Sequence, residues 1–135
     1  ITEVLNVDNI LVRGIGVPHA NVPTIGYRVD IGDSSIAFSS DQNGSNPSFI
    51  EFIQDVDVLV IHMTVDEDAR GFGAELHAKP SIWGQMATRS DVGHVLVSHI
   101  SATSPEMLQT RLDVLRDNYS GPVTVGEDLL CLEVG

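Results

Sequence analysis

An acidic side chain and an imidazole, each at the end of a strand-like run, are the residues best suited to chemistry in this sequence. Asp41 follows the run Ser35-Ile36-Ala37-Phe38-Ser39-Ser40, and His99 closes the run Val95-Leu96-Val97-Ser98-His99. Side chains at the ends of neighbouring buried strands can converge on one point. A carboxylate oxygen and an imidazole nitrogen are ligands that suit a divalent metal such as zinc. The pattern therefore predicts a metal site.

Four further histidines extend or compete with this pair. His19 precedes a strand-like run and offers a third ligand, and His77 lies in a loop before an expected helix. His62 ends a buried run and is the main rival for a ligand role, ranked behind the other histidines. His94 is five residues before His99 on one strand, so the two face opposite sides and His94 is expected at the surface.

Each candidate also has a simpler interpretation. In the loop from Ser39 to Gly44, Asp41 can close an Asx-turn with its carboxylate. His99 can be a core histidine satisfied by a neighbouring serine, and His77 an ordinary solvated histidine. The sequence alone leaves these alternatives open.

Length and composition restrict the class of protein. The 135 residues predict a single domain over 1–135, and 42% hydrophobic with 19% charged residues is typical of a soluble globular chain. A net charge of −12 and only seven Lys and Arg residues argue against nucleic-acid binding through this segment. The longest apolar run is too short to cross a membrane, and no signal peptide is visible, so the compartment stays open. Cys131 cannot form an internal disulfide and is expected to be buried.

The order of the expected elements predicts a sheet covered by helices on one side. A hairpin is expected around Gly32-Asp33, and the strongest helix begins at a Ser104 cap and a Pro105 start. The expected strands are 9–12, 25–31, 35–39, 56–62, 94–100 and a final pair, 123–125 and 129–134; the expected helices are 47–54, 81–90 and 104–119.

Several segments, in this order, resemble the ribonuclease Z-like branch of the metallo-β-lactamase fold. The stretch 17–29 is similar to that family's metal-binding His before a Gly-Tyr-Arg strand, and 36–41 to its strand ending in Gly-Asp-Thr. The remaining matches are 57–62 with the next core strand, 76–80 with the His-Ser-Thr loop, 95–101 with the strand that ends in the last metal-binding His, and 121–129 with the closing strands.

The family's His-x-His-x-Asp-His motif is absent from this chain. That motif belongs to the N-terminal half of an αββα sandwich. The resemblance therefore implies an α/β (α+β) fold that forms the C-terminal half of the sandwich, with a mixed sheet covered by helices on one face. It also implies a partner: the missing N-terminal half, or a second copy in a homo-oligomer.

Carried over residue by residue, the resemblance implies that His19, Asp41 and His99 are metal ligands, with Asp41 bridging two ions. His77 would be the proton donor or oxyanion stabiliser. Two supporting positions differ: Gly-Asp-Thr has become Ser40-Asp41-Gln42, and His-Ser-Thr has become His77-Ala78-Lys79.

The implied function is that of a hydrolase with two divalent ions, zinc first and manganese or iron as alternatives. A metal-bridging hydroxide would attack a phosphodiester or another ester of a small-molecule substrate, and this chain alone is expected to be inactive. Two alternatives remain: a non-catalytic association module that retains the fold, and a related hydrolase acting on cyclic nucleotides, sulfate esters or lactones.

Overall fold

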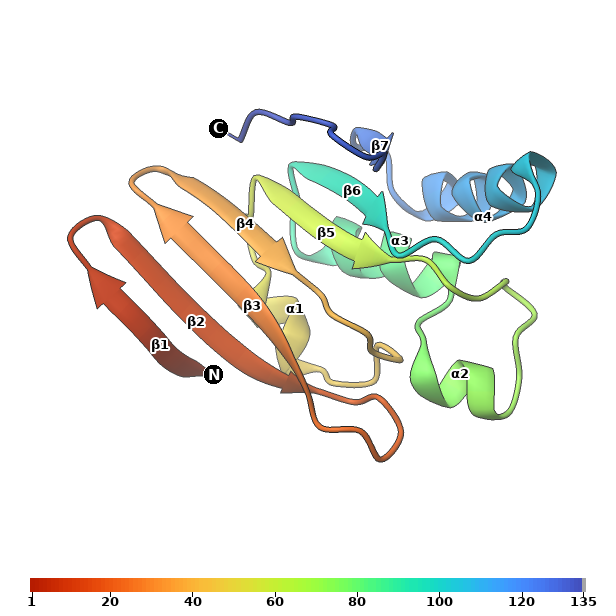
Figure 1. Cartoon of the computed structure of the whole chain (residues 1–135), viewed down its shortest axis with the longest axis horizontal. Coiled ribbons are helices and arrows are strands. Elements are labelled where there is room, and N and C mark those ends of the chain that lie inside the picture. Colours follow the sequence, from red (N-terminus) through yellow and green to blue (C-terminus); the bar gives the residue numbers. More distant parts are fainter. Residues whose placement is uncertain (135) are drawn as a thin grey trace.

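A computed structural model, which describes residues 1–134, shows a seven-stranded mixed sheet with four helices among these residues. The strands follow one another across the sheet in chain order (Figure 1). They are β1 Thr2–Val7, β2 Ile10–Val17, β3 Thr24–Ile31, β4 Ser34–Phe38, β5 Val58–His62, β6 His94–Ser98 and β7 Val123–Val125. The helices are α1 Ser48–Phe52, α2 Phe72–Leu76, α3 Pro80–Arg89 and α4 Pro105–Asn118.

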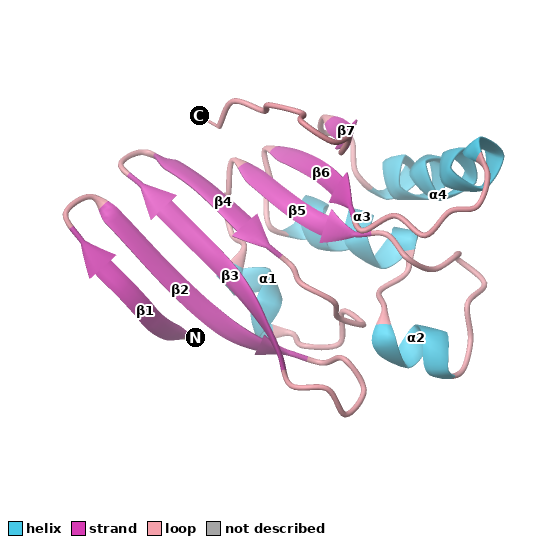
Figure 2. Cartoon of the chain, in the orientation of Figure 1, coloured by secondary structure: helices cyan, strands magenta, loops and turns pink. Residues whose placement is uncertain are grey.

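The sheet changes character at β4. Strands β1 to β4 form an antiparallel meander, whereas β4 to β7 run parallel and are connected through helices (Figure 2). Parallel neighbours need such crossover connections, and each connection brings the chain back to start the next strand in the same direction. The parallel strands therefore all end at one edge of the sheet, where the expected functional residues lie. The predicted mixed sheet is confirmed.

The core lies on one face of the sheet, under the helices. Leu59 and Ile61 of β5 and Val95 and Val97 of β6 are at most 1% exposed and belong to one hydrophobic cluster. The helices contribute to the same cluster Phe49 and Phe52 from α1, Trp83, Met86 and Ala87 from α3, and Leu112 and Leu115 from α4. Helices covering one face of the sheet is the arrangement that the sequence predicts.

Local chemistry explains the best-predicted elements. Gly32 has φ +58 at the two-residue turn between β3 and β4, where glycine meets no steric penalty. The Ser104 hydroxyl accepts a hydrogen bond from the Met107 N–H at 3.2 Å, and this satisfies one free donor at the start of α4. The Asn46 side chain accepts from the Ser48 N–H at 3.0 Å at the start of α1.

Two expectations for the C-terminal segment were wrong. Residues 129–134 do not form a strand; Leu129 is fully exposed, and Cys131 is exposed rather than buried. After β7 the chain turns, with the Leu130 N–H bonded to the Glu127 carbonyl, and then runs along the end of the sheet (Figure 1). The segment is apolar but finds no strand ladder, so its side chains stay outside the core. No helix among residues 1–134 is long and apolar enough to cross a membrane.

Candidate metal centre

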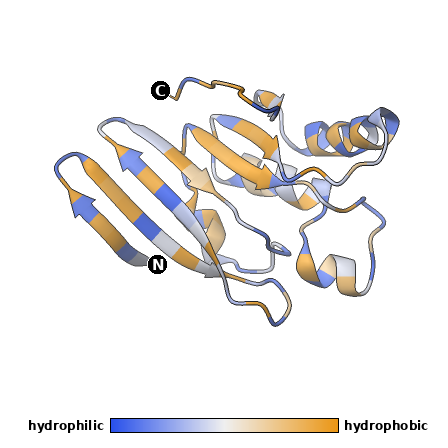
Figure 3. Cartoon of the chain, in the orientation of Figure 1, coloured by the Kyte–Doolittle hydropathy of each residue, from blue (hydrophilic) through white to orange (hydrophobic). Residues whose placement is uncertain are grey.

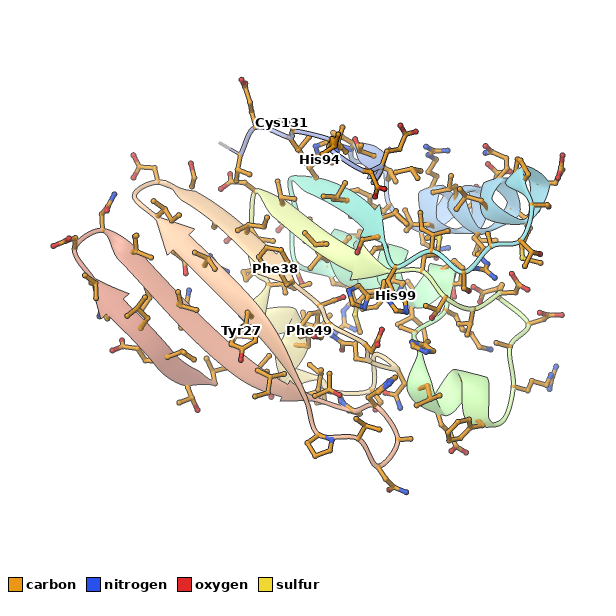
Figure 4. The ribbon with its side chains drawn as sticks, in the orientation of Figure 1. Tyr27, Phe38, Phe49, His94, His99 and Cys131 are labelled. Atoms are coloured by element: carbon orange, nitrogen blue, oxygen red, sulfur yellow. The ribbon has the colours of Figure 1, made fainter. Side chains whose placement is uncertain are left out.

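Five polar side chains gather at the edge where the parallel strands end. Asp41 follows β4, His62 is the last residue of β5, and His99 directly follows β6. His19 comes from the loop between β2 and β3, and His77 directly follows α2. Figure 4 shows His99 at the end of β6 that faces α2, with His94 at the opposite end of the strand.

Asp41 is the centre of this cluster. One of its carboxylate oxygens, Oδ1, lies 2.7 Å from His62 Nδ1, 3.7 Å from His77 Nδ1 and 4.0 Å from His99 Nε2. The His62 and His99 rings stack with centroids 4.9 Å apart and 17° between their planes. Three imidazoles from different elements therefore converge on one carboxylate.

His19 joins the cluster through His77. Their rings meet edge to face with centroids 5.0 Å apart. His19 Nδ1 lies 2.8 Å from the Leu76 carbonyl oxygen, and since a carbonyl only accepts, Nδ1 carries the proton and donates. Its Nε2 then has a free lone pair. A backbone carbonyl holding one ring nitrogen is the usual support of a metal-binding histidine.

Backbone hydrogen bonds tie the loops of the cluster together. The Ala78 N–H donates to the Gln42 carbonyl at 2.6 Å, and the Asn43 N–H donates to the Pro18 carbonyl at 2.9 Å. The Gln42 side chain is 1% exposed and donates to the Ser39 carbonyl at 2.9 Å. The loops that carry Asp41, His77 and His19 are thus bonded to one another.

The structure distinguishes between the two interpretations of Asp41 and of His99. The hydrogen bond of the Asp41 carboxylate is with His62, whereas the Asx-type bond in this loop is made by Asn43, whose side chain accepts from the Ser45 N–H. His99 has a side chain 53% exposed, so it is not a buried core histidine. It also has φ +45, a conformation that is uncommon outside glycine and turns the chain sharply at the end of β6.

The protonation states favour cation binding. Burial raises the pKa of the Asp41 carboxyl, but the hydrogen bond from His62 and the nearby His62, His99 and His77 outweigh it and lower the pKa below its ordinary value. Burial lowers the pKa of His77, and its histidine neighbours add to that effect against the opposing charge of Asp41. Near neutral pH the cluster therefore presents a carboxylate and, at His77, a neutral imidazole.

The donor set fits a divalent metal. Asp41, His62 and His99 each offer one ligand atom, and these atoms lie within 4.8 Å of one another. His77 Nδ1 is buried without a hydrogen-bond partner, which is an energetic cost that a bound ion or substrate would relieve. One carboxylate with imidazoles is the ligand chemistry of zinc and of related first-row ions.

All four sequence-predicted site residues lie in this cluster. His77 Nδ1 and His99 Nε2 lie 3.7 Å and 4.0 Å from Asp41 Oδ1, and His19 contacts the His77 ring. Sequence analysis placed His62 behind the other histidines, yet it is the side chain nearest to Asp41. The signal that could have ranked it higher is its place at the end of β5, because β5 lies between β4 and β6 and all three end at the same edge.

Comparison with known proteins gives a consistent fold. The search of family models found no match, and no curated protein sequence matches the chain. Solved structures do match. The metallo-β-lactamase fold protein YhfI from Bacillus subtilis superposes with a TM-score of 0.78 at 20% identity, covering 93% of this chain and 50% of that protein.

Two further structures show the same fold. Human tRNase Z, short form, has a TM-score of 0.74 at 19% identity and covers 98% of this chain and 46% of its own. Zinc-bound PqqB from Methylobacterium extorquens has a TM-score of 0.69 at 14% identity, and the match covers 98% of this chain and 53% of PqqB. The chain thus has the metallo-β-lactamase fold and spans about half the length of the structures it matches.

Proposed function

We propose that this chain carries half of the metal centre of a metal-dependent hydrolase. The observation that supports it is the convergence of His62, His77 and His99 on the ionised Asp41 at the edge where the parallel strands end. In open sheets with parallel strands, this edge is where ligands bind. The fold is that of the metallo-β-lactamase proteins, which include zinc-bound PqqB.

In the proposed centre, His19, Asp41 and His99 would hold two divalent ions, zinc first, with the Asp41 carboxylate as the ligand common to both. When bound, the ions supply positive charge and a water molecule activated for attack at neutral pH. His19 enters with Nδ1 already held by the Leu76 carbonyl, which leaves Nε2 for an ion. The hydrogen bond from the Asn43 N–H to the Pro18 carbonyl ties the loop of Asp41 to the loop of His19.

His77 is proposed to act on the substrate. Its lowered pKa keeps it neutral near pH 7, so it can donate an N–H hydrogen bond to an oxygen that gains negative charge; the protonated form of the ring would be the one that passes a proton to a leaving group. The 3.7 Å between His77 Nδ1 and Asp41 Oδ1 supports a role close to the proposed ions rather than at the far end of a substrate.

The proposed substrate is a small phosphodiester or other ester. A cavity of about 320 Å³ adjoins His99 and is lined in part by Glu127 and Asp128. With a net charge of −12, this chain offers little positive field for a polyanion such as RNA. The hydrolase acting on cyclic nucleotides, sulfate esters or lactones is a variant of the same proposal.

Another polypeptide segment is proposed to complete the centre. Three ligands shared between two ions leave both coordination shells short, since zinc takes about four ligands. The face of the sheet opposite the helices carries exposed apolar side chains, among them Ile25 (48%), Tyr27 (39%) and Phe38 (41%). An exposed apolar surface of this kind marks an interface. The occupant that fits the half-length match is the missing half of the fold, with the remaining ligands.

Zinc titration of this chain by calorimetry tests the proposal. We expect saturable but weak binding by the wild type and its loss in Asp41→Asn, which keeps the shape of the side chain but removes its charge. His94→Ala is the matched control, because His94 lies at the other end of β6 and bonds Thr124. Equal binding by Asp41→Asn and the wild type, or no binding by either, would overturn the assignment. A non-catalytic association module is the second candidate function, and it predicts no saturable zinc binding.

A further inference from the structure

His62 makes the shortest contact in the cluster. Its Nδ1 lies 2.7 Å from Asp41 Oδ1, and an ionised carboxylate offers only acceptors. The proton of this hydrogen bond must therefore belong to His62, with Nδ1–H as donor. A hydrogen bond to a charged acceptor is among the stronger kinds that side chains form.

His62 is held both at its backbone and at its ring. The His62 carbonyl accepts a hydrogen bond from the Trp83 indole N–H at 3.0 Å, and Trp83 is 1% exposed in the core. The ring itself stacks on His99 with 4.9 Å between centroids. The backbone of His62 also pairs with Ser98 in the parallel ladder between β5 and β6, whereas the ladder between β4 and β5 ends at Val60. The donor therefore has a fixed position relative to Asp41.

The 2.7 Å separation is that of a hydrogen bond rather than of two ligands on one ion. Two ligand atoms, each about 2.0–2.1 Å from a tetrahedral zinc ion, are about 3.3 Å apart. The separation from Asp41 Oδ1 to the proposed ligand His99 Nε2 is 4.0 Å, which leaves room for an ion between them. The separation to His62 leaves room only for a proton.

We infer that His62 is a positioning residue that holds the Asp41 carboxylate by an Nδ1–H hydrogen bond and does not itself bind metal. This inference rests on the proposed function, since it gives His62 a role toward the Asp41 ligand. The hydrogen bond orients the carboxylate and reduces the freedom that metal binding would otherwise remove. Support of this kind for a ligand typically changes metal affinity by about 10–100-fold.

Two substitutions separate support from ligation. Asn at position 62 keeps an N–H donor close to the place of Nδ1, whereas Leu keeps bulk without a donor. We expect His62→Leu to weaken zinc binding by about 10–100-fold and His62→Asn to stay close to the wild type. Circular dichroism and thermal unfolding of each variant control for folding, and His94→Ala controls for the loss of a histidine elsewhere.

The visible absorption spectrum of the cobalt(II)-loaded protein reports the ligands directly. We expect the spectrum of saturated His62→Asn to match the wild type, because the set of ligands is unchanged. A changed spectrum in His62→Asn, together with equal loss of affinity in both variants, would show that His62 is a ligand and overturn the inference. Unchanged affinity in His62→Leu would overturn it too, while leaving the proposed function intact.

A readout that needs no metal completes the test. The ¹⁵N chemical shifts of the His62 ring in the metal-free protein should show the proton on Nδ1. A proton on Nε2 alone would contradict the hydrogen bond and the inference with it. If the wild type binds no metal, the proposed function itself fails, and this outcome differs from every outcome in which only His62 is misassigned.

Discussion

The two faces of the seven-stranded sheet differ in what covers them. On the helix side, Ala37, Leu59 and Val97 are fully buried, and the helices seal them into one cluster. On the other side, Tyr27 and Phe38 form a cross-strand pair on β3 and β4 and are 39% and 41% exposed. Figure 3 shows hydrophobic residues recurring along β2 and β3 and dominating β5. Both faces are built from apolar residues, but only one has a partner layer.

The two faces of the sheet therefore have different roles. The covered face holds β4, β5 and β6 in register, and that register sets where Asp41, His62 and His99 meet. The open face carries exposed apolar side chains such as Tyr27 and Phe38. The cluster around Asp41 therefore forms on the covered part of the sheet, and the segment proposed to complete the centre would pack against the open face.

The largest expected effect comes from opening the covered face. Leu59→Ala should lower the free energy of unfolding by about 2–5 kcal/mol, because a fully buried side chain is lost and a cavity remains. Phe38→Ala, on the open face of the adjacent strand, should cost below about 1 kcal/mol. Urea unfolding of the two variants measures the contrast. Equal losses would mean that the open face is already covered in solution, by a second copy of this chain.

A smaller effect is expected from making the open face polar. Tyr27→Thr combined with Phe38→Thr removes the aromatic pair but keeps residues that favour strands. We expect lower fluorescence of the hydrophobic dye ANS and little change in zinc affinity. If zinc binding fell together with the dye signal, zinc affinity would depend on the open face, and the two faces would not have separate roles.

The smallest effect concerns His77, which lies where the parallel strands of the sheet end. The pKa of His77 is lowered in the folded protein, so the unfolded chain takes up more protons as the pH falls through its ordinary value near 6.5. The folded state should therefore lose stability between about pH 7.5 and the lowered pKa. In His77→Gln this part of the pH dependence should disappear, as measured by urea unfolding at several pH values. An unchanged slope would show that His77 is not buried as described.

Much of the fold follows from short-range patterns in the sequence. The two-residue turn at Gly32, the Ser104 cap and the apolar run of β5 each carry a local signal, and each element forms where expected. Strand β1 is not among the expected strands. Its adjacent Val4 and Leu5 break the alternation of a strand, and the pairing of β1 with β2 shifts register between Glu3 and Leu5.

The sequence predicts which side chains gather around Asp41 but not how they contact one another, and their roles as ligands stay a prediction. The strand ends and the family resemblance indicate Asp41, His99, His77 and His19, and these side chains do gather. The bond between His62 and Asp41 depends on the register of β4 against β5, which is set by packing far along the chain. The segment 129–134, which carries Cys131, was predicted as a strand because its residues are apolar. Nothing in this local pattern shows that no neighbouring strand pairs with it.

Anomalous scattering at the zinc edge from crystals of this chain grown with zinc tests the central claim most directly. The account predicts a peak within bonding distance of Asp41 and His99, at the edge where β4, β5 and β6 end, with His62 still hydrogen-bonded to the carboxylate. Asp41→Asn crystals should lack that peak. A peak confined to other carboxylates, such as Asp66 and Asp68, or the same peak in Asp41→Asn, would contradict it.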